Sequence, residues 1–198
     1  MKKADQFRRE AGKRILVLDG AIGTLIQKEG LVEGDFHDES LKDVLGSVNG
    51  SLKGCNDLLS LTKPELIYDI HYRFLEAGAD IITTNTFTAN PISLSDYQVE
   101  ELTYDINAAS AELARDAAVE FEMRDSRPRF VAGSIGPTNK TLSISPRVES
   151  PEYRDITFDE LSRGYKLQIE GLVDGGVDLL HQQVLQSAVY IPGTTHQK

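Results

Sequence analysis

The sequence predicts an α/β fold that corresponds to the first half, about four βα units, of a (β/α) TIM-type barrel. Short apolar runs alternate with helical segments up to about residue 180, and one kind of helix-to-strand turn occurs twice. A full eight-unit barrel typically needs about 250 residues, whereas this chain has 198. We therefore expect a truncated barrel, in which the pattern stops before the sheet can close.

Four short apolar runs are the predicted strands. They lie at 14–18, 80–84, 129–133 and 177–180. Continuous apolar runs of this length are typical of strands that are buried on both faces, as in a parallel sheet. This pattern predicts a parallel sheet with helices packed beside it.

Helical patterns separate the runs. The predicted helices lie at 3–12, 23–29, 62–77, 92–122 and 157–174. Thr62 and Thr157 are each followed three residues later by glutamate, which is the pattern of a capping box at a helix start. Between the second and third helices, residues 30–60 form a long irregular segment, which is more often functional or self-packed than idle.

The repeated turn joins a helix to a strand. Residues 76–82 and 174–180 share the order of helix end, glycine, small residue, aspartate and apolar strand. The same turn used twice indicates stacked βα units with right-handed crossovers. An open doubly wound sheet is the alternative, although the first βα turn lacks the G-x-G-x-x-G pattern of the dinucleotide-binding form.

Composition narrows the classes of function. The net charge is −10, and an acidic surface repels phosphate backbones, which argues against nucleic-acid binding. No apolar run approaches the ~20 residues that span a bilayer, so we expect no membrane association. A single cysteine, Cys55, rules out an internal disulfide and fits a reducing compartment, so the expected location is cytoplasmic.

The chain divides into three predicted parts. Residues 1–13 form an N-terminal helix or extension, and residues 14–180 form the partial barrel domain. Residues 181–198 begin with a glutamine-rich stretch and read as a divergent, disordered tail.

Polar clusters follow the first three predicted strands, where parallel βα folds place their functional sites. They lie at 19–24, 84–87 and 133–139. In the first cluster Gly20 and Gly23 allow backbone N–H groups to approach a ligand closely, and Asp19 is suited to an ammonium group. Local turns and hydrogen bonds within the loops are the alternative explanation for all three clusters.

Other reactive residue types show no supporting pattern. Cys55 has no cysteine or histidine at metal-binding spacing, so we expect an ordinary thiol. His71 falls on the apolar stripe of its helix and is predicted to be structural. We therefore predict no catalytic residue and no metal ligand.

Taken together, the clusters resemble the homocysteine-binding domain of cobalamin-dependent methionine synthase, in the homocysteine S-methyltransferase family. The resemblance covers about residues 5–180, in the order and spacing of the family. The matching stretches are 14–24, 52–57, 77–82 with 85–87, 131–133 with 136–139, and 155–160.

The resemblance implies a (β/α)8 barrel in which homocysteine takes a methyl group from methylcobalamin, supplied by methyltetrahydrofolate, to give methionine. In that family three cysteine thiolates hold a zinc ion, which binds the homocysteine sulfur and lowers its pKa. The resemblance also implies that Asp19 and the Gly20–Ala21 backbone hold the amino-acid end of homocysteine. Asn85 and Thr86 would line the same pocket, which makes these five residues the predicted substrate-binding set.

Several positions depart from the family pattern. Ala21 replaces a second glycine, Thr83 replaces a glutamate, and by register Gln183 replaces an acidic residue that faces the substrate. The zinc cysteines of the family belong to later strands, which this sequence does not contain. We therefore expect that this chain alone binds no zinc, cobalamin or methyltetrahydrofolate, and that it transfers no methyl group.

Three functions stay open at this point. The first is a homocysteine S-methyltransferase by descent, in which this chain supplies only a weak or partial homocysteine site. The second is a non-catalytic truncated isoform or fragment, which forms a homodimer through the open barrel edges or pairs with a full-length homologue. The third is an unrelated βα-barrel lyase or aldolase, although the sequence offers no strand-end lysine or metal cluster for it.

Overall fold

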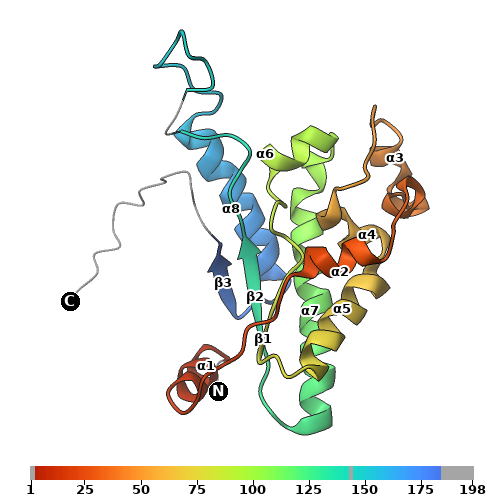
Figure 1. Cartoon of the computed structure of the whole chain (residues 1–198), viewed down its shortest axis with the longest axis vertical. Helices are drawn as coiled ribbons and strands as arrows, with labels where there is room; N and C mark the ends of the chain where they lie inside the picture. The colour runs from red at the N-terminus through yellow and green to blue at the C-terminus, as the bar shows by residue number, and fades with distance from the viewer. Residues whose placement is uncertain (1–2, 143–144, 184–198) are drawn as a thin grey trace, which may run out of the picture.

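A computed structural model describes residues 3–142 and 145–183, in which helices pack beside a small parallel sheet (Figure 1). The strands are β1 (Ile81–Thr83), β2 (Phe130–Ile135) and β3 (Leu179–Gln182). The longer helices are α1 (Lys3–Ala11), α2 (Ile22–Lys28), α5 (Pro64–Glu76), α7 (Thr103–Asp125) and α8 (Phe158–Asp174). The short helices are η1 (Glu33–Phe36), η2 (Glu39–Leu41), α3 (Lys42–Leu45), η3 (Asn56–Leu58), α4 (Leu59–Thr62), α6 (Pro91–Leu94), η4 (Ser95–Tyr97) and η5 (Glu100–Leu102).

The sheet is wound in the manner of a barrel segment. Its order is β1-β2-β3, and both neighbouring pairs are parallel. Helix α7 lies between β1 and β2 in the chain and α8 between β2 and β3, and the two helices pack against each other beside the sheet (Figure 1). A doubly wound sheet reverses its strand order and carries helices on both faces. Here the strands follow one another in sequence order and their crossover helices pack side by side, which favours the barrel interpretation.

The first predicted strand, 14–18, is only partly formed. It makes one parallel bridge, between Leu18 and Ile81, and the Ile81 N–H donates to the Val17 carbonyl at 3.0 Å. The prediction that this run is buried on both faces is wrong, because Ile15 is 89% exposed and Val17 is 53% exposed. No described part of the chain packs over these side chains, so apolar character alone does not bury them.

The two predicted capping boxes have different outcomes. Thr157 accepts the Glu160 N–H at 3.2 Å, and the Glu160 carboxylate accepts the Thr157 N–H at 2.8 Å, as predicted. The prediction for Thr62 is wrong: α5 begins after Lys63, which makes no side-chain cap, and Thr62 is the buried last residue of α4. A short preceding helix therefore overrides the local pattern.

The helix predicted over 92–122 is divided in the structure. After α6 and η4, Gln98 takes a left-handed conformation with φ of 58°, which ends the first part. Helix α7 then runs to Asp125 and ends at Ser126, which also has φ of 58°. The long helix is therefore α7 alone, with the turns before it forming the loop that follows β1.

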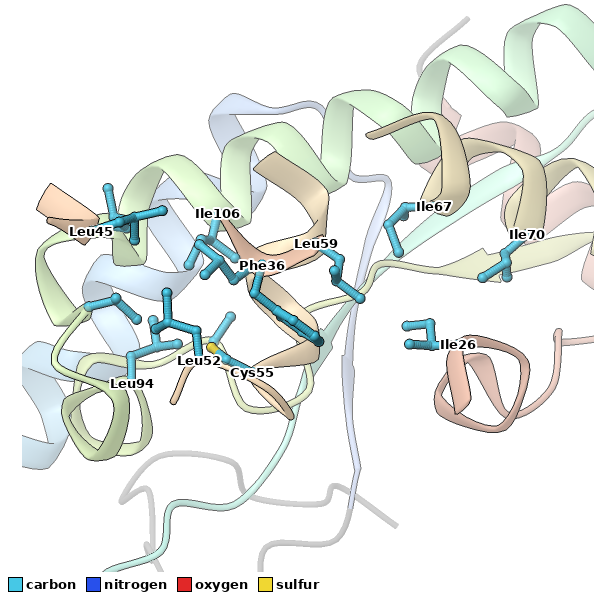
Figure 2. Close-up of a cluster of buried hydrophobic side chains, with 14 residues drawn as sticks. Ile26, Phe36, Leu45, Leu52, Cys55, Leu59, Ile67, Ile70, Leu94 and Ile106 are labelled. Carbon is cyan, nitrogen blue, oxygen red and sulfur yellow. The ribbon is translucent and has the colours of Figure 1, made fainter. Parts of the chain in front are cut away.

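The irregular segment 30–60 packs into a hydrophobic core that it shares with α2, α5, α6 and α7 (Figure 2). Phe36, Leu52 and Cys55 are almost completely buried there, together with Ile26 from α2 and Ile67 from α5. Burial raises the pKa of the Cys55 thiol to about 12, as expected for an ordinary core cysteine. This segment is therefore packed rather than idle, as the sequence predicted, and it forms a platform beside α2, α5 and α7.

Helix α1 confirms the first predicted helix and packs at the amino-terminal end of the strands. The Phe7 ring lies edge-on to Phe130, at the start of β2, with 5.2 Å between ring centroids. Lys3 pairs with Glu122 of α7 and donates to the Arg129 carbonyl at 3.2 Å. Among the residues described, no helix combines the length and apolar character needed to cross a membrane.

The repeated helix-to-strand turn makes the same hydrogen bonds at both of its sites. The Asp80 carboxylate accepts the Val17 N–H at 2.9 Å, and the Asp80 N–H donates to the Val17 carbonyl at 2.8 Å. The Asp178 carboxylate accepts the Val131 N–H at 2.9 Å, and the Asp178 N–H donates to the Val131 carbonyl at 2.8 Å. Each aspartate therefore holds the start of its strand to the neighbouring one, and we call this pair of contacts the aspartate clamp.

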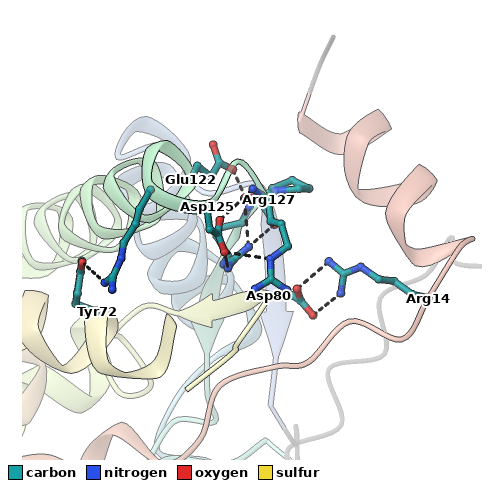
Figure 3. Close-up of polar contacts among 9 residues, drawn as sticks. Arg14, Tyr72, Asp80, Glu122, Asp125 and Arg127 are labelled. Atoms are coloured by element: carbon teal, nitrogen blue, oxygen red, sulfur yellow. Dashed lines mark hydrogen bonds and ion pairs between the residues drawn. The ribbon is translucent and has the colours of Figure 1, made fainter. Parts of the chain in front are cut away.

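An arginine pairs with each aspartate of the clamp. Arg14 makes two hydrogen bonds of 2.8 Å to the Asp80 carboxylate (Figure 3), and Arg115 lies 2.7 Å from the Asp178 carboxylate. Both aspartates are buried at about 5% exposure of the side chain. A buried carboxylate is tolerated when it is paired and hydrogen-bonded, so the arginines complete the clamp.

We predict that Asp80→Ala lowers the free energy of unfolding by about 2 kcal/mol, because it removes the buried carboxylate that pairs with the partly exposed Arg14 and leaves the Val17 N–H without its acceptor. Urea denaturation followed by circular dichroism measures this change. Asp69→Ala is the matched control, because Asp69 is exposed on α5 and should change stability by less than about 0.5 kcal/mol. Equal effects of the two substitutions would contradict a role for the clamp.

Candidate functional site

A cavity of about 330 Å³ lies at the carboxyl ends of the strands. Segments that follow each strand line it, together with the end of the platform, and the contributions come from 20–23, 54, 56–57, 83–88, 134 and 183. Parallel βα folds carry their ligand sites at this end of the sheet. The first two polar clusters predicted from the sequence, and part of the third, therefore meet at one place.

The structure brings four of the five predicted site residues to this cavity. Gly20, Ala21, Asn85 and Thr86 all line it. The fifth, Asp19, is not among the lining residues. A role in binding stays a prediction for all five, and the structure gives the first four a common location.

Asp19 is held by the first strand of the sheet. Its carboxylate accepts the Thr83 N–H at 2.8 Å and the Thr83 hydroxyl at 3.0 Å. Burial raises the pKa of Asp19 to about 6, and the hydrogen bonds from Thr83 act in the opposite direction. Asp19 therefore fastens the segment before α2 to β1, with both partner groups supplied by the protein.

Asn85 and Thr86 use their donors within the protein. The Asn85 side-chain amide donates to the Asn56 carbonyl at 2.7 Å, and its backbone N–H donates to the Ser110 hydroxyl at 2.8 Å. The Thr86 hydroxyl donates to the Ser134 carbonyl at 2.8 Å. Both side chains are at most 5% exposed. They connect three segments of the cavity wall and thereby fix its shape.

The platform supplies two polar residues that sequence reasoning did not assign to a site. Asn56 and Asp57 both line the cavity, and Asp57 accepts hydrogen bonds from the Thr88 N–H at 3.2 Å and from the Thr88 hydroxyl. Burial raises the pKa of Asp57. Both residues belong to the stretch 52–57 that resembles the family, which was a sequence signal for a functional role. The irregular segment around this stretch did not allow its position relative to the strands to be predicted.

Gln183, which the sequence places by register where the family has an acidic residue, lies at the cavity. It lines the cavity, its side-chain amide donates to the Ser134 hydroxyl at 3.2 Å, and its N–H extends the ladder to the Ile135 carbonyl at 2.9 Å. Strand β3 ends at Gln182, two residues beyond the predicted domain boundary at 180. The remainder of the predicted tail, 184–198, lies outside the described residues.

The third predicted cluster lies between two cavities. Ser134 reaches the first, whereas Pro137, Thr138 and Asn139 line a second cavity of about 410 Å³. Gly136 sits at the junction, where its N–H donates to the Phe87 carbonyl at 3.0 Å. A Cβ at Gly136 would lie 2.4 Å from that carbonyl oxygen, so the close approach of these two loops requires glycine.

The donor groups of the described residues do not fit a zinc ion. Within 3–142 and 145–183, no three side chains of histidine, cysteine, aspartate or glutamate come together as a metal site. The Cys55 thiol is buried in apolar surroundings that disfavour the thiolate. His71 is completely buried, which lowers its pKa to about 4, and its ring nitrogens have no hydrogen-bond partner, as for a core residue.

A sequence profile of the homocysteine S-methyltransferase family matches residues 16–190 of this chain. The chain belongs to the homocysteine S-methyltransferase family. This confirms the family resemblance inferred from the polar clusters. The match runs ten residues past the predicted boundary at 180, while the division into domains stays a prediction.

Solved structures of homocysteine methyltransferase MmuM from Escherichia coli share the fold. The metallated form has a TM-score of 0.65 and 23% identity, over 91% of this chain and 57% of that chain. The oxidized form has a TM-score of 0.61 and 24% identity, over 86% of this chain and 53% of that chain. This chain therefore spans about half the length of the enzyme that it matches, with a partial TIM-like methyltransferase fold.

We predict that Gly136→Ala lowers the free energy of unfolding by about 2 kcal/mol or more, because the new methyl group collides with the Phe87 carbonyl. Gly23→Ala is the matched control in the first polar cluster, since a Cβ there meets nothing within 4 Å. It should be neutral or stabilising by up to about 1 kcal/mol, because alanine favours the helix. Thermal unfolding of both variants measures the contrast, and a neutral Gly136→Ala would show that the loops can separate freely.

Proposed function

We propose that the 330 Å³ cavity binds the amino-acid end of homocysteine and that this chain forms part of a homocysteine S-methyltransferase. The observation that carries the proposal is the meeting of Gly20, Ala21, Asn85 and Thr86 at one cavity at the carboxyl ends of the strands. The family match supports homocysteine as the substrate class. The described sheet would be the first part of a (β/α)8 barrel.

The methyl donor is the finer part of the proposal. We propose methylcobalamin, recharged by methyltetrahydrofolate, as in cobalamin-dependent methionine synthase. Support comes from the stretches 52–57 and 155–160, which resemble that enzyme. The product would be methionine.

The chemistry of the described residues is binding and orientation. A homocysteine sulfur attacks a methyl group as the thiolate, and zinc supplies that activation in the family. The described donor groups do not fit zinc, so the described residues act on the amino-acid end of the substrate and not on its sulfur. We propose that this chain alone binds neither zinc nor cobalamin nor methyltetrahydrofolate, and that it orients the amino-acid end of the substrate.

Titration with homocysteine, followed by ¹H–¹⁵N NMR, tests the site. We expect millimolar binding that shifts the amide resonances of Gly20, Ala21, Asn85 and Thr86. The amides of His37, Asp38, Glu39 and Lys42, which line a separate hollow of the platform, serve as an internal control and should not move. Propanethiol, which lacks the amino-acid end, should cause no shift at the cavity. An absence of cavity shifts with homocysteine, or equal shifts with both thiols, would refute the proposed site.

A second candidate function is a non-catalytic chain that self-associates or pairs with a full-length homologue. The exposed apolar side chains at the sheet favour it, namely Ile15, Val17, Leu18 and Leu180, which are all at least 40% exposed. Within the described residues, β3 pairs only with β2, so its other edge has open backbone groups. Exposed strand edges and apolar patches promote association.

We predict a dimer for the unmodified chain in sedimentation equilibrium at micromolar concentration. The double variant Ile15→Lys with Val17→Lys should shift this equilibrium toward monomer, because charge at the apolar edge opposes pairing. Val148→Lys is the control, since Val148 is also exposed, at 97%, but belongs to the loop between β2 and α8. A compact, cooperatively unfolding monomer of the unmodified chain would contradict this candidate.

A further inference from the structure

Asn49 and Gly50 form an exposed bend of the platform, just after α3. Asn49 is the only asparagine in the sequence that is followed by glycine. Asn139 is the other exposed asparagine, and it is followed by Lys140. Three further asparagines are buried, at positions 85, 90 and 107. The chain therefore offers one exposed asparagine–glycine pair and one exposed asparagine with a bulky neighbour for comparison.

An asparagine–glycine pair has the chemistry for deamidation. The glycine nitrogen, on loss of its proton, attacks the asparagine Cγ, and the new C–N bond closes a five-membered succinimide while ammonia leaves. Water then opens the ring at either carbonyl carbon. One opening gives aspartate, and the other gives isoaspartate, in which the chain runs through Cβ and Cγ. Water is consumed and ammonia is released, with no change of oxidation state.

The surroundings of Gly50 leave its nitrogen free to react. Its φ is 151°, a conformation that favours glycine, so the turn itself requires the residue without a Cβ. Apart from its chain neighbours, no atom lies within 4 Å of the place where a Cβ would stand. Within the described residues, the Gly50 N–H donates no hydrogen bond. The attacking group is therefore both unhindered and unpaired.

The side chains of the two exposed asparagines differ in the same direction. The Asn139 amide donates to the Asp96 carboxylate at 2.6 Å, which holds its side chain in place. In the described part of the chain, the Asn49 side chain makes no hydrogen bond, and both of the contacts of Asn49 with Gln98 involve its backbone. The Asn49 side chain can therefore turn toward the Gly50 nitrogen.

We propose that Asn49 is a site of spontaneous deamidation, with water as the co-reactant, and that Gln98 limits its rate. The Gln98 side-chain oxygen accepts the Asn49 N–H at 3.1 Å, and its amide donates to the Asn49 carbonyl at 3.0 Å. That carbonyl belongs to the same planar peptide group as the Gly50 nitrogen. Gln98 therefore restrains the rotation that brings the nitrogen to the Asn49 Cγ.

The isoaspartate product removes the peptide group that Gln98 holds, because Gly50 is then linked through Cγ. Gln98 ends the turn η4, with φ of 58°. Asp96 and Tyr97 of this turn line the second cavity, of about 410 Å³. Modification of Asn49 thus detaches the platform from a wall of that cavity.

The test follows the unmodified, folded chain during incubation at mildly alkaline pH. Trypsin places the two exposed asparagines in separate peptides, 43–53 and 130–140, and mass spectrometry measures the conversion of amide to acid in each. A fresh digest sets the starting value. We expect Asn49 to convert at least about tenfold faster than Asn139, which corresponds to about 1.4 kcal/mol in the barrier.

The same chain in urea gives the rate of the pair without the fold. Gln98→Gly, which suits the left-handed turn, should speed conversion severalfold in the folded chain and leave the rate in urea unchanged. Equal rates at Asn49 and Asn139 in the folded chain, with fast conversion of Asn49 in urea, would overturn the site. An unchanged folded-state rate in Gln98→Gly would overturn the role of Gln98. If this variant does not fold, Gln98→Asn, whose amide is one methylene shorter, replaces it with the same expected result.

Discussion

The aspartate clamp is the constraint on which the rest of the structure depends. The strands of the sheet are short, so few ladder hydrogen bonds hold them together. At the start of β1 and of β3, the aspartate carboxylate and backbone N–H add two hydrogen bonds to the neighbouring segment. These bonds fix the register of each strand relative to that segment. Because register sets where each strand ends, it also decides that the segments after 83, 134 and 182 open onto the same cavity.

The amino-terminal end of the sheet stabilises the fold, whereas the carboxyl end carries the candidate binding site. At the amino-terminal end, buried charges are paired, as Asp80 is with Arg14, and α1 packs Phe7 against Phe130. At the carboxyl end, polar side chains are buried around an open space, and Asp57 has hydrogen bonds without a cation. Buried polar side chains are tolerated only when they are hydrogen-bonded, and the wall of the cavity gathers such hydrogen-bonded side chains at one end of the sheet.

Sequence reasoning predicted the elements whose signals are local. The strands β1, β2 and β3, the capping box at Thr157 and the helix α1 all follow from apolar runs and cap spacing. It failed where other parts of the chain decide the outcome. Ile15 and Val17 are exposed because no described residue packs over them. Thr62 is the last residue of α4 and so does not cap α5. The cavity was predicted only in part for the same reason. The predicted strand ends were enough to place 20–21 and 85–86 at the site. Residues 56–57 reach the cavity from the irregular segment 30–60, which has no periodicity from which their position could be predicted.

The platform adds a second source of stability to the cavity wall. It carries Asn56 and Asp57, and its buried side chains Phe36, Leu52 and Cys55 pack in a core shared with α2, α5 and α7 (Figure 2). Segments of this kind can open by local unfolding while the rest of a protein stays native. In hydrogen-exchange terms, the wall that holds Asp57 and the wall built on β1 would then exchange as different cooperative units. The affinity of the cavity would be set by the less stable of the two, so a core substitution far from any ligand can weaken binding without loosening the sheet.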